Sequence, residues 1–352
     1  MRTTSAWIGT ALLLLLATAG CGEDLSTFGA LPGSDGRGSP SPSQPAGDLP
    51  DAGAGPAALD AGVADAGSSP PSSAAPEGSG IFPPDSPWNT RIDSAPVDPR
   101  SEAYIASMGA DDPLVASWDA EGDGIPYVEV DGNQARVPVS FWGFSDESDP
   151  GPYPIPWNAP IDRSTDHHVI VVDRTHGFLY ELFRGSRNSD GSWSASNGAR
   201  WNLRANESRP QGWTSADAAG MPIFPGLVRW DEVQAGWIGH ALRFAVNRSQ
   251  RGYVWPAVHA AGTCATGSDC PPMGLRLRLK KSIDISRFSP RMQVVLRALQ
   301  LYGMFVADNS GGTSWWVAGA PDPRWSDGED LSLGAIKGRD FEVVGHGEIQ
   351  PQ

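Results

Sequence analysis

The chain has 352 residues and a formal net charge of −15, and Gly and Pro contribute 42 and 32 of its residues. This acidic balance, without any cluster of Lys and Arg, excludes a nucleic-acid partner, because neutralising phosphates requires grouped cations. Large apolar side chains are scarce in residues 22–79, whereas thirteen of the 14 Trp follow residue 80. Composition therefore separates an N-terminal segment that cannot form a core from one candidate globular unit.

Residues 1–20 have the pattern of an export signal. Arg2 precedes an apolar run that is too short to span a bilayer as a mature helix. The run ends in the triplet AGC, which resembles the bacterial lipobox, although Thr18 stands where that box usually has an aliphatic residue. The resemblance implies a lipoprotein signal peptide, with Cys21 diacylated as the mature N-terminus; plain secretion is the alternative. Two acyl chains would attach the protein stably to membrane lipid.

Residues 21–79 are rich in Pro, Ala, Gly and Asp, and triplets of sequence DAG begin at Asp51, Asp60 and Asp65. Such a composition cannot bury enough apolar surface to offset the loss of chain entropy, so we expect a disordered tether. Residues 80–352 are then a single globular domain. The tether would hold this domain away from the outer membrane or cell surface, where it can meet large extracellular molecules.

Two cysteines remain in the globular part. Cys264 and Cys270 enclose a short polar loop, and an exported protein meets an oxidising compartment. A zinc site is the alternative, but the loop lacks the usual spacing of two residues between cysteines and contains no His. The sequence therefore predicts a disulfide that closes this loop.

Short apolar runs separated by Gly, Pro, Asp and Asn characterise the globular part. Frequent turn residues between short strands are typical of all-β folds, so we expect a mainly-β domain, either an antiparallel β-sandwich or a jelly roll. The expected strands are Tyr127–Val130, Ala135–Phe141, His168–Asp173, Phe178–Phe183, His240–Val246 and Leu275–Lys280.

One helix is predicted over about residues 289–303. Ser289 can cap it, Pro290 suits its first turn and Gly303 can end it. Its apolar residues follow helical spacing, so the helix is expected to pack on a sheet: Met292, Val295, Leu296, Leu299 and Tyr302.

The hairpin formed by residues 168–183 has the clearest register. A four-residue loop places Val172 opposite Leu179 and Ile170 opposite Glu181. Continuing this register places His168 opposite Phe183, on the same face as Glu181. The hairpin therefore predicts an inward-facing carboxyl near a histidine.

Several motifs along the globular part resemble an uncharacterised family of secreted bacterial proteins. The resemblance covers residues 80–345, and the motifs recur in the same order. It implies an extracellular address, and some members of the family lie beside carbohydrate-binding modules; it implies no catalytic residues. The motifs include DHHVIVVD at 166–173, GWTSADAAGMPIFPGLVRWDEV at 212–233, YVWPAVH at 253–259 and GAPDPRW at 319–325.

Familiar catalytic signatures are missing from the sequence. HExxH, GxSxG, a Walker loop and a dinucleotide-binding GxGxxG do not occur, which excludes zincins, common serine hydrolases and nucleotide enzymes. No cofactor is expected. The remaining candidates for chemistry are carboxylates and histidines near strand ends: Asp166, His168, Glu181, Asp217, Asp231, Glu232, His240 and His259.

Glycan cleavage needs a proton donor and a second carboxyl group. Glu181 is the expected acid, because an inward-facing carboxyl among apolar neighbours has a raised pKa. Asp217, in a loop of small residues beside Trp213, is the expected partner, and His168 and His240 complete the catalytic set. The structural alternatives are a buried Glu181 paired with Arg200 or Arg204, and an Asp217 that caps a turn.

Metal binding is a second use of the same residues, with His168, His240 and His259 converging beside Glu181. Satisfied structural histidines are the favoured interpretation, so no metal is assigned. Asp119, Glu121 and Asp123 resemble half of a calcium loop, but Val130 occupies the position of its closing Glu, which favours a solvated turn.

Aromatic and basic residues near these acids are candidates for sugar binding. The expected substrate-binding residues are Trp201, Trp213, Arg200 and Arg204. The run Leu275–Lys280 alternates Leu with Arg or Lys, which predicts either a solvated sheet face or a cationic stripe for a uronate glycan.

The expected function is recognition of a polysaccharide, with possible cleavage by carboxylate acid–base chemistry in a glycoside hydrolase or polysaccharide lyase. A noncatalytic glycan-binding or surface-architecture lipoprotein is the alternative. An enzyme requires two of the acidic or histidine side chains to face each other in an open cleft, whereas a binding protein requires only exposed Trp and polar groups.

Overall fold

The computed structural model describes residues 81–313, 315–325 and 331–352. The expected signal peptide, the lipid attachment at Cys21 and the tether lie outside these residues. In the described ranges, no helix is long and apolar enough to cross a membrane.

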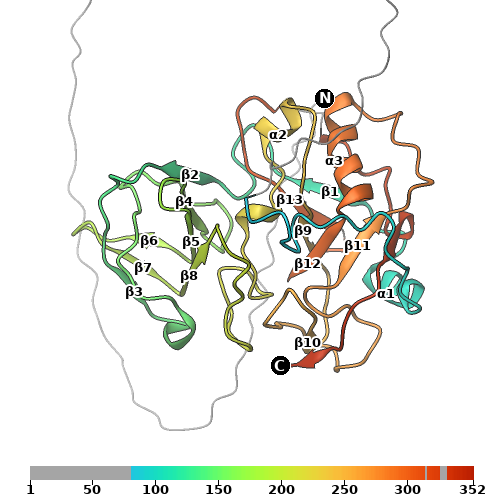
Figure 1. Ribbon diagram of the computed structural model, residues 1–352, viewed down its shortest axis with the longest axis horizontal. Coiled ribbons are helices and arrows are strands. Elements are labelled where there is room, and N and C mark those ends of the chain that lie inside the picture. Colours follow the sequence, from blue (N-terminus) through green and yellow to red (C-terminus); the bar gives the residue numbers. More distant parts are fainter. Residues whose placement is uncertain (1–80, 314, 326–330) are drawn as a thin grey trace, which may run out of the picture. The chain divides into compact units, whose positions relative to one another are not determined.

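Strands dominate the described chain (Figure 1). The helices are α1 (Ser101–Met108), α2 (Trp230–Gln234) and α3 (Pro290–Leu301), with 3-10 turns at Ser145–Glu147, Phe224–Gly226 and Gly338–Asp340. The strands of the first half are β1 (Leu114–Ser117), β2 (Tyr127–Val130), β3 (Val139–Phe141), β4 (Val169–Asp173), β5 (Phe178–Phe183), β6 (Ser186–Arg187), β7 (Trp193–Ala195) and β8 (Asn197–Asn202). Those of the second half are β9 (Leu242–Val246), β10 (Gly252–Tyr253), β11 (Arg276–Leu279), β12 (Met304–Asn309), β13 (Trp315–Ala318), β14 (Phe341–Val343) and β15 (Gln350–Pro351).

The largest sheet has six strands in the order β1-β13-β9-β12-β11-β14. Its pairs β1–β13 and β9–β12 are parallel, whereas β9–β13, β11–β12 and β11–β14 are antiparallel. The mainly-β class with a C-terminal helix is confirmed, but the sheets are mixed and open instead of purely antiparallel. Parallel pairing requires long crossovers, and the β9–β12 crossover contains β11 and α3.

A four-stranded sheet, β2-β4-β5-β8, lies beside a three-stranded sheet, β3-β7-β6. Its hairpin has the predicted register, since Val172 pairs with Leu179 and Ile170 with Glu181. Strand β4 is buried throughout, because its alternate residues enter two different cores: Ile170 and Val172 on one face, Val169 and Val171 on the other. Burial on both faces explains the unbroken apolar run of β4.

Helix α3 forms where the sequence predicts it. The Ser289 hydroxyl accepts a hydrogen bond from the Met292 amide at 3.3 Å, and Pro290 occupies the first turn. The helix packs against β11 and α2 through the apolar face that the spacing indicates: Met292, Val295, Leu296 and Leu299. The two shorter helices, α1 and α2, were not predicted from the sequence.

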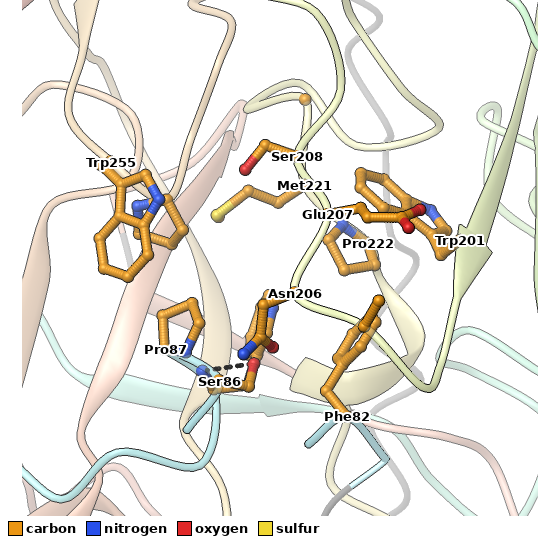
Figure 2. Close-up of a pocket in the computed structure, with 14 residues that line it drawn as sticks. Phe82, Ser86, Pro87, Trp201, Asn206, Glu207, Ser208, Met221, Pro222 and Trp255 are labelled. Carbon is orange, nitrogen blue, oxygen red and sulfur yellow. Dashed lines mark hydrogen bonds between the residues drawn. The ribbon is translucent and has the colours of Figure 1, made fainter. Parts of the chain in front are cut away.

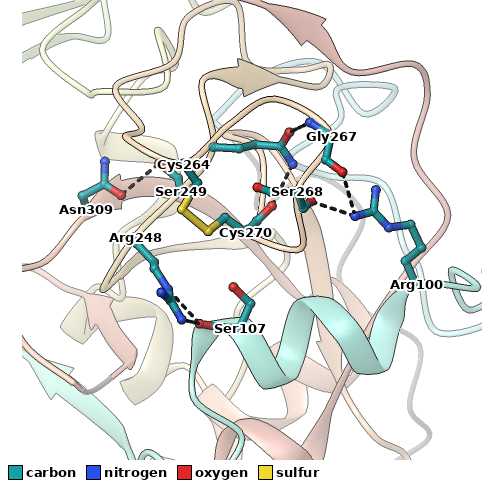
Figure 3. The surroundings of a disulfide bond; sticks show 10 residues. Arg100, Ser107, Arg248, Ser249, Cys264, Gly267, Ser268, Cys270 and Asn309 are labelled. Carbon is teal, nitrogen blue, oxygen red and sulfur yellow. Dashed lines mark hydrogen bonds between the residues drawn. A yellow bond between two sulfur atoms is a disulfide. The ribbon is translucent and has the colours of Figure 1, made fainter.

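The disulfide between Cys264 and Cys270 is present, as predicted (Figure 3). Gln250 lies against the loop that it closes, donating to the Cys270 carbonyl at 2.7 Å and accepting from the Gly267 amide at 2.7 Å. The Arg100 guanidinium donates to the Ser268 carbonyl at 2.7 Å. The loop is thereby fixed both to its own neighbourhood and to α1.

The alternating Leu and Arg residues around β11 make their contacts within the protein. Its leucines are buried, as expected, but its arginines are covered by the chain segment of residues 87–95. Arg276 donates to the carbonyls of Pro87 (2.9 Å) and Thr90 (2.6 Å), and Arg278 donates to the Ala95 carbonyl (2.8 Å). Both interpretations from the sequence, a solvated face and a stripe for a uronate glycan, are therefore wrong, because each guanidinium satisfies buried carbonyl groups.

Residues 213–223, which we call the central loop, connect the four-stranded and six-stranded sheets. On one side, the Thr214 amide donates to the Glu147 carboxylate at 2.7 Å. On the other, the Ala219 amide donates to the Ala307 carbonyl of β12 at 3.1 Å. Nearly all of the loop is buried, so its backbone groups depend on partners in both sheets.

Candidate active site

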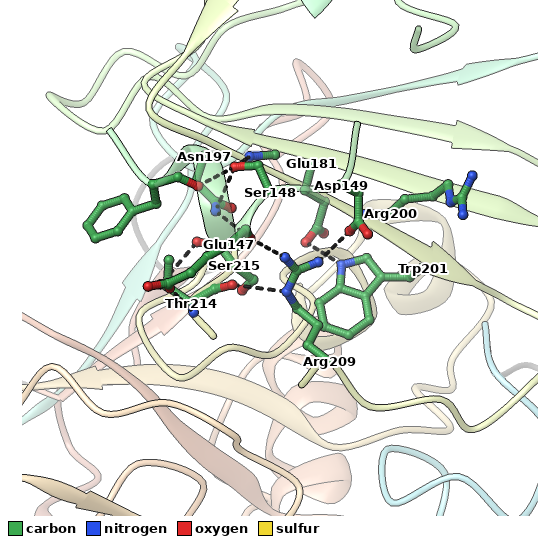
Figure 4. Close-up of polar contacts among 12 residues, drawn as sticks. Glu147, Ser148, Asp149, Glu181, Asn197, Arg200, Trp201, Arg209, Thr214 and Ser215 are labelled. Atoms are coloured by element: carbon green, nitrogen blue, oxygen red, sulfur yellow. Dashed lines mark hydrogen bonds and ion pairs between the residues drawn. The ribbon is translucent and has the colours of Figure 1, made fainter. Parts of the chain in front are cut away.

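Glu181 is fully buried beneath the central loop. Its carboxylate accepts hydrogen bonds from the amides of Ile223 and Phe224, both at 2.9 Å. It also accepts one from the Trp201 indole at 3.3 Å (Figure 4). Burial raises the pKa of Glu181 to about 7, although the two backbone amides oppose this shift. The raised pKa agrees with the expectation, but a substrate cannot reach a carboxyl with no exposed surface. Glu181 therefore positions the loop and is not the general acid.

The expected arginine partners of Glu181 lie elsewhere. The Arg200 guanidinium stacks over the Phe178 ring at 5.5 Å, and Arg204 donates to the Thr175 carbonyl at 2.9 Å. Both arginines are exposed on β8 and the loop that follows it. The pairing of Glu181 with Arg200 or Arg204 is therefore wrong, and neither arginine lines a described cavity with the candidate acids.

Asp217 of the central loop is also buried, and it pairs with an arginine. Its carboxylate accepts from Arg243 Nε at 2.9 Å and from the Ala219 amide at 3.3 Å. Arg243 is the second residue of β9, so this ion pair joins the loop to the six-stranded sheet. Glu181 and Asp217 do not face each other in an open cleft, and the expected catalytic pair is replaced by two structural carboxylates.

His168 lies just before β4 and contacts acceptors through both ring nitrogens. Nδ1 lies 2.5 Å from the Asp162 carboxylate, and Nε2 lies 3.1 Å from the Ala216 carbonyl. An ionised carboxylate and a carbonyl oxygen only accept hydrogen bonds, so these two contacts favour the doubly protonated, charged form of the ring. Burial lowers the pKa of His168, but the contact with Asp162 raises it by more. His168 is therefore a fixed cation and not a free base.

The other histidines do not converge with His168. His240 contacts the Glu232 carboxylate at 3.1 Å and the Ala241 carbonyl at 2.8 Å. His259 Nδ1 lies 2.7 Å from the Ala218 carbonyl. Across the part of the chain that the structure describes, no group of three or more His, Cys, Asp or Glu could hold a metal ion. The geometry supports a structural role for these histidines. For His240 this structural role replaces the expected catalytic one.

An open cavity of about 620 Å³ lies beside Asp162 and His168. Residues of β1, β9, β12 and β13 line it together with the segment before β4. Two arginines, Arg163 and Arg243, and the side chains of Trp118 and Trp316 contribute to the wall. Five aspartates also line it: Asp119, Asp123, Asp162, Asp166 and Asp308. We call this space the acidic cavity.

Asp308 reaches the cavity because β12 contains a bulge. The pairing of β12 with β9 shifts between Val306 and Asp308, which leaves Ala307 without a paired residue. The Ala307 carbonyl instead accepts the amide of Ala219 in the central loop. Bulges commonly re-aim side chains next to active sites, and this one directs Asp308 toward Arg243, 3.8 Å away.

Asp308 is an acid with an unusual environment. Its side chain is 30% exposed to the cavity, yet protein surrounds it on the other sides. Burial and the charge of Asp217 raise the pKa of Asp308 to about 6, against the opposing charge of Arg243. The Asp166 carboxylate also lies close enough for its charge to raise this pKa. The carboxyl groups of Asp308 and Asp166, which have different environments, thus line the same accessible cavity.

Within the described ranges, the carboxylate of Asp166, like that of Asp123 in the same cavity, has no hydrogen-bond or ion-pair partner. Its backbone is nevertheless held, since its amide donates to Ser164 Oγ at 3.1 Å and its carbonyl accepts from the Arg184 amide at 2.7 Å. Asp162 orders the same segment by accepting from the Ser164 amide at 2.7 Å. A fixed backbone therefore presents an unpaired carboxylate to the cavity.

The expected sugar-binding tryptophans flank an arginine that the sequence did not single out. The Arg209 guanidinium lies over the rings of Trp201 and Trp213, at 5.7 and 5.6 Å. It also binds the Asp149 carboxylate at 2.5 Å, beside Trp201 (Figure 4). It also donates to the Thr214 carbonyl at 2.9 Å. This cluster holds the start of the central loop and leaves Trp213 only half-buried.

Asp308, Arg243 and Asp162 are the site residues that sequence reasoning missed. Asp308 follows the apolar residues of β12. An acid in that position is a weak signal of a functional site, because many purely structural turns also have one. Asp162 and Arg243 carry no local signal, because only the folded chain brings them to His168 and Asp217.

No family model, no curated protein sequence and no solved structure matches this chain.

Proposed function

We propose that this protein binds and hydrolyses a neutral extracellular polysaccharide, and that cleavage occurs in the acidic cavity. The observation that carries this proposal is the presence of Asp308 and Asp166 in one open cavity, with the pKa of Asp308 raised to about 6. Two carboxyl groups whose environments separate their protonation states are what glycoside hydrolysis requires.

In this proposal, protonated Asp308 is the general acid. It donates its proton to the glycosidic oxygen as the bond from that oxygen to the anomeric carbon breaks. Asp166 is the base that accepts a proton from the water that attacks the anomeric carbon, and exchange with solvent restores both groups. Arg243 holds Asp308 and Asp217, and the Asp162–His168 pair holds the segment that carries Asp166.

The walls of the cavity suit a neutral sugar better than a uronate. Its five aspartates outnumber its two arginines and the His168 cation, so an anionic chain would be repelled. Carboxylates and the hydroxyls of Ser117 and Ser164 can bind sugar hydroxyls, and the indoles of Trp118 and Trp316 line the same space. Export and lipid attachment at Cys21, predicted from the sequence, would bring this cavity to extracellular glycans.

The test uses the full chain, purified in detergent, with cellulose, chitin, xylan, starch and alginate. New reducing ends are expected from at least one of the neutral polysaccharides. Asp308→Asn and Asp166→Asn should each lower the rate by about two to four orders of magnitude, because each removes a positioned proton transfer. Turnover should also fall as pH rises through about 6, since Asp308 must be protonated to act as the acid.

Asp190→Asn is the matched control, because Asp190 is an exposed turn residue outside the cavity. Its rate should equal that of the unaltered protein. If a polysaccharide is retained and no reducing ends appear, the noncatalytic glycan-binding alternative replaces the proposal. Equal rates for the three variants on a cleaved polysaccharide would show that the reaction occurs elsewhere.

A further inference from the structure

A second pocket lies against Gly220, Met221 and Pro222 of the central loop (Figure 2). We infer that this pocket is a separate binding site for a sugar unit of the same neutral polysaccharide, with the Trp255 indole as its stacking surface. The inference rests on the proposed substrate class, but it concerns a site that contains none of the acids proposed for cleavage.

Trp255 is the most exposed large apolar side chain among the described residues, with 67% of its surface accessible. Figure 2 shows its ring at one side of the pocket, across from Trp201 and Pro222. The floor is apolar and buried, and it contains Phe82, Trp88 and Met221. An exposed indole above an apolar floor can receive the C–H face of a pyranose ring.

Polar groups lie at the opposite rim. Asn206, Glu207 and Ser208 are consecutive and exposed, and they supply an amide, a carboxylate and a hydroxyl to the pocket. Asn206 Nδ2 donates to the Asp85 carboxylate at 2.8 Å, which orients the amide. A pocket that combines a ring surface with several hydrogen-bonding groups matches a sugar, which has apolar faces and hydroxyl edges.

The pocket is supported by fixed backbone on each side. The Val254 amide donates to the Met273 carbonyl at 2.9 Å, and the Ala257 amide donates to the Val254 carbonyl at 3.0 Å, which holds the turn that carries Trp255. Trp201 is held through its indole by buried Glu181. Both aromatic walls are therefore in place before a ligand arrives, which lowers the entropic cost of binding.

The test measures retention on each neutral polysaccharide of the same panel, whether or not it is cleaved, for the full-length protein and three variants. Trp255→Ala should weaken binding by about fivefold to tenfold, the size of a lost stacking contact. Trp157→Ala is the control, because Trp157 is 61% exposed but lies outside this pocket. Trp255→Phe should restore most of the binding, and equal melting temperatures should exclude misfolding.

A second measurement separates this inference from the proposed function. Trp255→Ala should leave the cleavage rate on a soluble disaccharide or trisaccharide unchanged, because such substrates can occupy the acidic cavity alone. Unchanged retention of Trp255→Ala would overturn the pocket assignment, even if Asp308→Asn abolishes cleavage. Conversely, a loss of retention in Trp255→Ala with no cleavage by the unaltered protein would support the pocket and refute the hydrolase.

Discussion

The buried ionisable side chains of this protein have different hydrogen-bond partners, and these partners indicate whether each side chain is structural or a candidate for catalysis. His168 lies between two oxygen acceptors and is held as a cation, whereas Glu181 receives only N–H donors. Asp308 has neither a full set of donors nor complete burial, and an accessible carboxyl with a raised pKa is the kind of group that transfers protons. Surroundings, more than residue type, thus distinguish the structural acids from the candidate catalytic acid.

Glu181 should make the stability of the protein depend on pH in a defined window. Its pKa is about 7 in the folded protein and ordinarily 4.5, so folding favours the protonated form. The contribution is fully present below about pH 4.5 and is lost as pH rises through about 7, by about 3 kcal/mol. Urea unfolding between pH 4 and 8 should show this loss in the unaltered protein, and Glu181→Gln should lack it.

Glu129→Gln is the control for that experiment, because Glu129 is exposed and pairs only with Arg174. Its unfolding free energy should follow the same pH dependence as the unaltered protein. Parallel profiles for all three proteins would mean that the folded state does not hold Glu181 at a raised pKa.

At the scale of elements, side chains of strand β11 fix the position of residues 87–95, a segment without regular secondary structure. Arg276 donates to the carbonyls of Pro87, Thr90 and Tyr302 and has no carboxylate partner among the residues that the structure describes. Burial lowers its pKa to about 9. The Phe305 ring lies beneath the guanidinium at 4.7 Å. The segment of residues 87–95 therefore depends on side chains of the sheet for its position.

Arg276→Ala should destabilise the protein by about 3 kcal/mol or more, because it leaves several buried carbonyl groups without donors. Thermal and urea unfolding measure this loss. Arg251→Ala removes an exposed arginine and should change the unfolding free energy by less than about 0.5 kcal/mol. Similar stabilities for the two variants would show that water replaces the guanidinium at those carbonyls.

The sequence predicts the elements whose evidence is local. The β4–β5 register follows from a short loop and alternating residues, and α3 follows from its cap and its spacing. Strands β1 and β13 were not predicted, because each has four residues and pairs in parallel with a strand far away in the sequence. The candidate site could not be predicted from the sequence for the same reason. The bulge that presents Asp308 depends on how β12 pairs with β9, which is distant in the sequence.

At the scale of the whole molecule, attachment at Cys21 is the property that would fix where the protein acts. Cys21→Ala should release the protein from the membrane fraction, because both acyl chains depend on that sulfur. Fractionation followed by a high-salt wash measures the release. A Cys264→Ala, Cys270→Ala variant should stay with the membrane, since it lacks the disulfide but keeps the lipid site. Retention of Cys21→Ala in the washed membrane pellet would contradict lipid attachment.

The central loop has a consequence for how the protein reaches its folded state. Its amides and side chains bind β5 and β12, which belong to different sheets and are distant in the sequence. Closing such contacts is entropically unfavourable until both sheets exist, so we expect the loop to dock late, after the main folding barrier. Weakening its contacts therefore accelerates unfolding more than it slows folding. The Trp255 pocket, which Gly220, Met221 and Pro222 of this loop help to line, would be completed in that last step.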